Sequence, residues 1–198
     1  MSYPSYKKLK SFQQATTIYD LTVEFVELYI DRKSRTTDQM VQAARSGKQN
    51  IAEGSAASKT SPITEVRLLS VAQASLKELL EDYEDFLRQH TLLQWPMTDS
   101  RALTLRNLYK SYPTYTAYQS YLSDSEKAAN LLITLINQTT FLLDRQIKAV
   151  RDFHESRGAT LESQQQRLGR LQHEQLRKDQ EFDAYLEEQI KNSRTKKT

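Results

Sequence analysis

Apolar residues recur every three or four positions in four long segments of this chain, and this spacing predicts four amphipathic helices. The segments span residues 12–29, 37–53, 62–89 and 123–154. The joints between the first three are short, which favours antiparallel neighbours. The pattern therefore predicts an all-α protein built as an antiparallel, up-down-up-down four-helix bundle.

Residues with capping and turn preferences stand at the ends of these segments. Ser11 is a candidate N-cap for the first, and Gly54 is a candidate C′ residue to end the second. Ser61 and Pro62 suit the start of the third, because proline lacks the N–H that is unpaired at the first helical position. Ser123–Glu126 has the spacing of a capping box for the fourth.

The rest of the chain departs from this periodicity. Residues 91–122 contain Pro96 and Pro113 and are predicted to form an irregular, Tyr-rich insertion that covers one end or side of the bundle. Beyond Gly158 the composition turns to Gln, Glu, Arg and Lys. Its heptad positions are often polar, which disfavours a long coiled coil. We therefore expect a bundle domain over residues 1–158 and a polar helical extension with a frayed end over residues 159–198.

Composition excludes several classes of protein. The chain has 198 residues with 4 Gly, 4 Pro and no Cys. Disulfides, thiolate metal sites and cysteine nucleophiles are therefore excluded, and turn-rich β sandwiches or barrels are disfavoured. No apolar run approaches the roughly 20 residues of a membrane span, and the start lacks a signal-peptide pattern. These features predict a soluble, cytoplasmic protein that does not enter a membrane.

The sequence carries no recognisable catalytic pattern. Its three histidines have no histidine partner three or four residues away, and no glycine-rich phosphate loop is present. The acidic residues of the third segment lack the Glu-x-x-His spacing of di-iron bundles. We therefore expect a protein that is not an enzyme and that uses no metal or cofactor.

Positive and negative charges are segregated along the chain, although the net charge is only +3. Residues 35–59 and 101–122 are basic, whereas residues 60–100 carry an excess of four acidic groups. Clustered cations favour a polyanion because they release its counterions. The same segregation also suits head-to-tail contacts between subunits, or a solvated surface of mixed charge.

A tyrosine occupies every third position from Tyr109 to Tyr121. With nearby cations, these rings could stack on single-stranded RNA. Alternatively, they seal the insertion onto the bundle with the ring inward and the hydroxyl outward.

Two helical motifs resemble a known family. The stretch from Gln39 to Gly54 ends in Asn-Ile-Ala-Glu-Gly, and Leu68 to Leu79 resembles its partner helix. This pattern is similar to that of the four-helix bundle proteins encoded in intervening sequences of bacterial large-subunit ribosomal RNA. The family is related to the accessory variability determinant of diversity-generating retroelements. Gly47 and Lys48 stand where many members have Ile-Pro, and the long insertion and C-terminal extension also depart from the pattern.

This resemblance implies a non-catalytic four-helix bundle that forms ring-like pentamers. It also implies a context of either a reverse transcriptase with structured RNA or a ribosomal RNA operon. Within the motifs, Asn50 and Glu53 lie on one helix face. They are candidates for a subunit interface or for bracing the helix end, and Glu53 should have a specific partner because a carboxylate is unfavourable near a helix C-terminus. Gly54 and Glu78 belong to the same structural or interface group.

The favoured interpretation is an RNA-binding, homo-oligomeric accessory protein. Its candidate phosphate-binding residues are all cations of the two basic segments: Arg35, Arg45, Lys48, Lys59, Arg101, Arg106 and Lys110. The alternative is a protein-interaction scaffold with no nucleic-acid role, in which the acidic helix and the Asn-Ile-Ala-Glu-Gly region form subunit and partner contacts.

Overall fold

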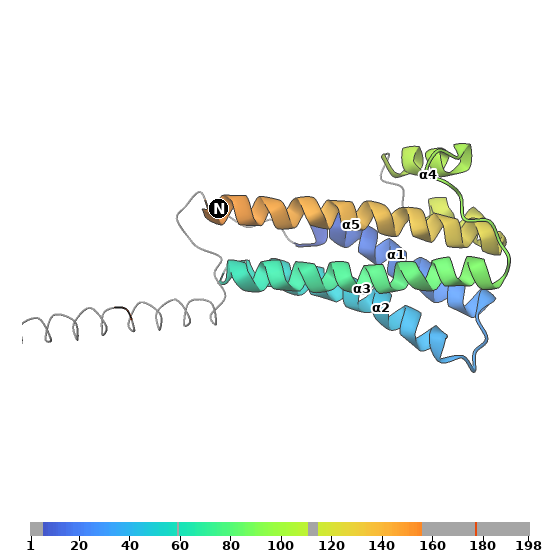
Figure 1. Ribbon diagram of the computed structural model, residues 1–198, viewed down its shortest axis with the longest axis horizontal. Helices are drawn as coiled ribbons and strands as arrows, with labels where there is room; N and C mark the ends of the chain where they lie inside the picture. Colours follow the sequence, from blue (N-terminus) through green and yellow to red (C-terminus); the bar gives the residue numbers. More distant parts are fainter. Residues whose placement is uncertain (1–5, 59, 111–114, 156–176, 178–198) are drawn as a thin grey trace, which may run out of the picture. The chain divides into compact units, whose positions relative to one another are not determined.

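Every regular element in the described part of the chain is helical. The computed structural model describes residues 6–58, 60–110, 115–155 and 177, and no strand occurs among them. The elements, drawn in Figure 1, are a 3-10 turn η1 (Tyr6–Lys8), α1 (Lys10–Tyr29), α2 (Arg35–Ala57), α3 (Pro62–Gln89), α4 (Ser100–Lys110), a 3-10 segment η2 (Tyr115–Ser123) and α5 (Ser125–Glu155). The chain divides into two compact units, residues 1–159 and 160–198, and all these elements belong to the first. The prediction of an all-α protein is confirmed.

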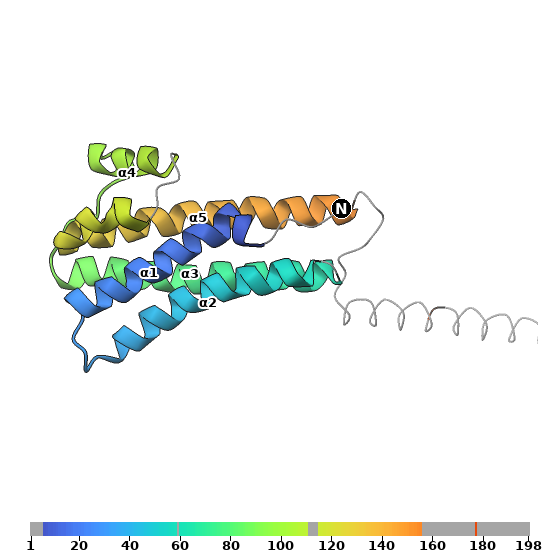
Figure 2. The ribbon, with the colours of Figure 1, turned by 180° about the vertical axis from the view of Figure 1, so that it is seen from behind.

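The four long helices surround a common apolar core. Helix α1 contacts α2 and α5, and α3 contacts the same two helices, as the view in Figure 2 shows. Phe25 of α1 is fully buried and packs edge-on against Tyr83 and Phe86 of α3. The buried Tyr83 hydroxyl donates to Thr22 Oγ1 at 3.0 Å, so this polar group has a hydrogen-bond partner inside the core. Burial raises the pKa of this phenol.

Gly47 allows α2 and α3 to approach closely, because a Cβ atom there would lie 2.9 Å from Leu76 Cγ. A Cβ atom on Gly54 would lie 3.5 Å from Leu69 Cδ2, which is an ordinary van der Waals contact. Gly54 is buried inside α2, which continues to Ala57, so its expected role as the C′ residue is wrong. Gly54 is an interior residue of the helix, which ends one turn later at the Ser58 cap.

The expected helix starts are correct at α3 and wrong elsewhere. Ser61 caps α3 by accepting from the Thr64 amide, with Pro62 at the first position. Helix α2 begins at Arg35, because Ser34 accepts from the Thr36 amide. Ser11 lies inside α1, where its hydroxyl donates to Gln146 Oε1 of α5 at 2.9 Å.

The expected capping box also fails at the start of α5. Asp124 accepts from the Lys127 amide at 2.9 Å and is therefore the cap. Ser123 instead donates to the Ser120 carbonyl. Glu126 turns toward the segment that precedes α4, where it binds the Trp95 indole.

Residues 91–122, expected to be irregular, contain α4 and η2. Asp99 stands at the start of α4, where its carboxylate accepts from the Arg101 amide at 2.8 Å. Ala102 and Leu105 of this helix are buried. Figure 1 shows α4 beside α5, and α5 is the element with which it packs. Phe153, near the end of α5, is 48% exposed. Pro113, Gly158 and the predicted extension apart from Arg177 lie outside the described residues.

Within the described residues, no helix has the length and apolar character needed to cross a membrane.

Candidate functional site

The cations expected to bind phosphate on α2 differ in their availability. Arg35 and Arg45 are exposed and form no ion pair with a described residue. Lys48 is half-buried, with its ammonium group 4.0 Å from the centre of the Tyr19 ring, which is a cation–π contact to α1. Lys59 lies outside the described residues. Two of these four cations are therefore free to meet a ligand.

The second group of expected cations is largely engaged in holding the insertion. Arg101 binds Asp99 at 2.8 Å and Glu126 at 3.4 Å, and its guanidinium lies 4.3 Å from the Trp95 ring centre. The hydrogen bonds from Arg101 lower the pKa of Asp99. Arg106 is half-buried on α4, and the side chain of Lys110 is outside the described part. The seven predicted cations do not form one continuous surface within the described residues.

The Asn-Ile-Ala-Glu-Gly region packs α2 against α3. Asn50 donates to the Ser46 carbonyl at 2.9 Å and to its hydroxyl at 3.2 Å. Ser46 in turn hydrogen-bonds to Ser75 of α3 at 2.9 Å. Asn50 thus braces an interhelical contact. The expectation of a specific partner for Glu53 is wrong within the described residues, where this exposed side chain makes no hydrogen bond or ion pair.

Tyrosines of the insertion pack against α1 and the apolar core where they are described. The Tyr115 hydroxyl donates to Glu24 of α1, and Tyr118 is buried. Tyr29 of α1 adds a hydrogen bond of 2.6 Å to the Leu122 carbonyl. Tyr121 packs partly buried against the same core. These contacts favour the packing interpretation over a stacking surface.

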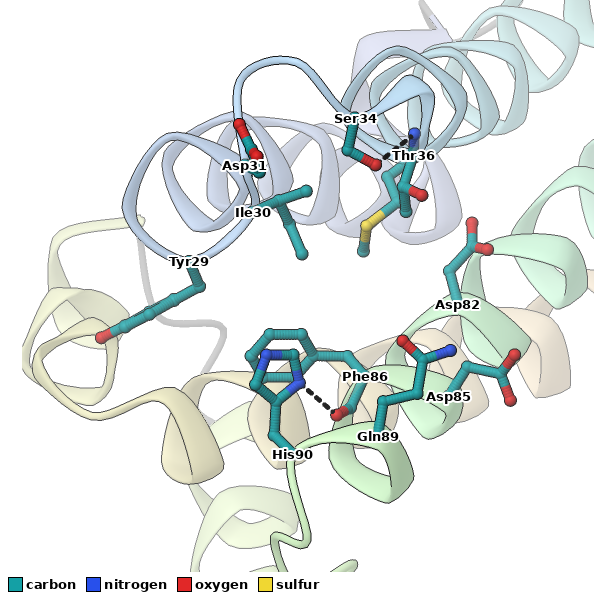
Figure 3. Close-up of a pocket in the computed structure, with 11 residues that line it drawn as sticks. Tyr29, Ile30, Asp31, Ser34, Thr36, Asp82, Asp85, Phe86, Gln89 and His90 are labelled. Carbon is teal, nitrogen blue, oxygen red and sulfur yellow. Dashed lines mark hydrogen bonds between the residues drawn. The ribbon is translucent and has the colours of Figure 1, made fainter.

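A polar pocket of about 320 Å³ lies between the α1–α2 turn and the end of α3. Figure 3 shows Asp31 on one side of the pocket, and Asp82, Asp85, Phe86 and His90, which belong to α3 and its end, on the other side. Burial, then the charges of Asp85 and Glu78, raise the pKa of Asp82. Glu78 itself is exposed, so it acts here as a neighbouring charge.

This pocket has no built cation site. Asp85 already pairs with Arg88 at 2.7 Å, and no three acidic or histidine side chains of the described residues gather closely enough to hold a metal. Its carboxylates lie beside the start of α2, where Thr36 also lines the pocket. They reduce the attraction that a phosphate group would experience at Arg35.

A groove between α4 and α5 has the character of a binding site for apolar side chains. Its cavity volume is about 630 Å³. Met97 and Phe141 line it while remaining 73% and 59% exposed. The complete lining is Gln94, Trp95, Met97, Ala102, Arg106, Ile133, Thr134, Asn137, Gln138, Phe141 and Leu142. No acidic residue is among these residues.

The floor of the groove is held by hydrogen bonds to α5. Asn130 accepts from the Trp95 amide at 2.7 Å and donates to the Leu93 carbonyl at 2.8 Å. The Trp95 indole N–H donates to Glu126 Oε1 at 2.9 Å, and the Leu93 amide donates to Glu126 Oε2 at 3.1 Å. These bonds lower the pKa of Glu126, the indole contributing most. Trp95 is 8% exposed, so the groove is a built feature of the fold.

Sequence reasoning missed this groove and the residues that form it. Trp95, the single tryptophan of the chain, precedes Pro96 in a segment without helical periodicity. Ala102, Leu105 and Leu108 recur at intervals of three, which is the signal that would have indicated α4. Phe141 has Asn137, Gln138 and Arg145 as its neighbours on the helix face, and this polar setting is the signal that would have indicated an exposed aromatic residue.

No family model, curated protein or solved structure matches this chain. The likeness to the ribosomal RNA intervening-sequence proteins therefore stays a prediction from its sequence motifs.

Proposed function

We propose that this chain is a non-catalytic protein-interaction module that binds apolar side chains of a partner in the groove between α4 and α5. In this proposal α1, α2, α3 and α5 form an antiparallel, up-down-up-down four-helix bundle that serves as the scaffold. The closed order of helix contacts and the short connections at residues 30–34 and 58–61 support that arrangement.

One observation carries the proposal: Phe141 and Met97 stay largely exposed on the walls of a concave surface with a rigid floor. Burying a large apolar side chain contributes about 1.5–3 kcal/mol, so covering these two would supply several kcal/mol to a complex. Monomeric proteins rarely keep such apolar patches without a binding role. The anchored Trp95 means that little ordering is needed before a ligand enters.

The test is a selection of displayed peptides on the intact protein, followed by binding measurements on two matched variants. Phe141→Asp places a charge in the groove and should weaken the selected peptides at least about tenfold. Phe153→Asp alters the other exposed phenylalanine of α5, which lies outside the groove, and should leave binding unchanged. Failure to enrich binders, or binders that respond equally to both variants, would contradict the proposal.

RNA binding by a homo-oligomer is the second candidate function, and the specific observation in its favour is the exposure of Arg35 and Arg45 without ion pairs. Pentamer formation and a reverse transcriptase or ribosomal RNA context belong to this candidate through the family resemblance. A second copy would double the number of weak phosphate contacts and raise affinity by avidity.

Binding of single-stranded and structured RNA across a salt series tests this candidate. If it is correct, affinity falls steeply with salt, and combining Arg35→Glu with Arg45→Glu abolishes binding. Arg67→Glu with Lys77→Glu makes the same change of charge on exposed positions of α3 and serves as the control. No binding at low salt, or equal loss in both double variants, would argue against the α2 surface.

A further inference from the structure

We infer that the groove between α4 and α5 takes an amphipathic helix whose flanking side chains are acidic. This inference rests on the proposed function and names the chemistry of the partner.

The groove is bordered by cations that no described carboxylate neutralises. Arg106 is one of its lining residues and forms no ion pair with a described residue. Arg145 follows Phe141 by four residues on α5, with its guanidinium 6.0 Å from the ring centre. Lys148 follows three residues later, and both side chains are exposed. Residues spaced by three and four share a helix face, so the apolar groove continues into a basic ridge.

Acidic groups near this ridge are fewer, and one of them is engaged. Asp144 accepts from Gln73 of α3 at 2.7 Å and so faces that helix. Asp152 is exposed near the far end of the ridge. Asp99 and Glu126, which lie behind the groove, are paired with Arg101. The lining of the groove contains Arg106 and no carboxylate, and the Arg145 guanidinium lies against the Phe141 ring. The charges that adjoin the apolar anchors are therefore positive, which favours a negatively charged partner.

The shape of the groove favours a helix as its occupant. Two helices form its walls, and the described part of the chain offers no strand edge to which an extended peptide could add. An amphipathic helix presents anchors at spacings of three, four and seven to such a groove. Acidic residues at the flanking positions would then reach Arg106 on one side and Arg145 and Lys148 beyond Phe141.

The experiment compares two synthetic helical peptides of about 16 residues, roughly 24 Å long, with identical apolar anchors. One carries glutamate at the flanking positions and the other carries lysine. We expect the acidic peptide to bind the full-length protein about tenfold more tightly, with a difference that shrinks from about 50 to 500 mM salt. Combining Arg145→Glu with Lys148→Glu should remove or reverse this preference. Arg67→Glu with Lys77→Glu should preserve it.

Each outcome separates the two proposals. If both peptides bind equally and Phe141→Asp weakens both, the groove is a docking site but the acidic partner is wrong. If neither peptide binds, the acidic helix is the wrong occupant, and the selection of displayed peptides decides separately whether the groove binds apolar side chains. If the protein self-associates through the groove, or if RNA binds and Phe141→Asp abolishes its binding, the occupant is a second copy or a nucleic acid and the inference is overturned. Circular dichroism of every variant verifies that the helices are intact.

Discussion

Replacement of Asn130 by alanine should loosen the floor of the groove. The Asn130 side chain is almost fully buried and holds two backbone groups of the segment before α4, the Trp95 amide at 2.7 Å and the Leu93 carbonyl at 2.8 Å; it also donates to the Glu126 carbonyl of its own helix at 2.9 Å. Its loss leaves the Trp95 amide unpaired in a buried place, which costs about 1–3 kcal/mol, and removes the hydrogen bond to Leu93, worth about 0.5–1.5 kcal/mol. The sum of these two contributions predicts a loss of about 1.5–4.5 kcal/mol in unfolding free energy.

The assay uses Trp95 as a probe, because it is the only tryptophan in the chain. Urea unfolding followed by circular dichroism gives the global stability, and tryptophan emission reports the position of the groove floor. If the segment detaches, emission shifts to the red before the helices unfold, and the global loss becomes smaller.

Asn137→Ala is the matched control. This exposed asparagine lies two turns further along α5 and bonds only to the Ile133 carbonyl within its own helix. If Asn130→Ala matches Asn137→Ala in both emission and midpoint, Asn130 does not hold the groove floor.

Two further predictions concern the helix contact and the pH dependence of stability. Gly54→Ala should stabilise the protein by about 0.5–1 kcal/mol, because alanine favours a helix and its Cβ atom fits. Gly47→Ala should be at least about 1 kcal/mol less stable than Gly54→Ala, because its Cβ atom would crowd Leu76. Equal thermal midpoints of the two variants would contradict the close approach of the helices at Gly47. The pKa of Glu126 is lowered in the folded state, so its stabilising contribution is complete above about pH 5 and is lost as the pH falls through the folded pKa. In Glu126→Gln the unfolding free energy, measured by urea titration, should therefore fall less between about pH 5 and 3 than in the unchanged protein. An equal fall in both proteins would refute this role of Glu126.

The long helices could be predicted because their signal is repeated many times along each segment. Ser61 and Pro62 added a start signal that has one physical meaning, and it was correct. Gly54 shows the limit, because it lies inside α2 although glycine is typical of helix ends. A Cβ atom there would make an ordinary contact with Leu69, 3.5 Å away, so helix packing does not require glycine at this position either.

The candidate site was much less predictable, because its members are brought together by the fold. Arg101 has the sequence context of a free cation, but one of its partners, Glu126, is 25 residues away. Phe141 stands among polar positions of α5, but that pattern does not indicate that α4 lies beside it and makes a groove there. Charge segregation along the sequence therefore identified cations, but it could not indicate which of them are already paired.

The most direct test of the groove is a titration of the intact protein with the glutamate-flanked peptide, followed by Trp95 emission. Trp95 lines the groove and is the only tryptophan, so binding there must change its surroundings. We predict a saturable shift in emission that Phe141→Asp abolishes and Phe153→Asp retains. Binding detected by calorimetry without a change in Trp95 emission would place the ligand elsewhere and contradict the proposed function.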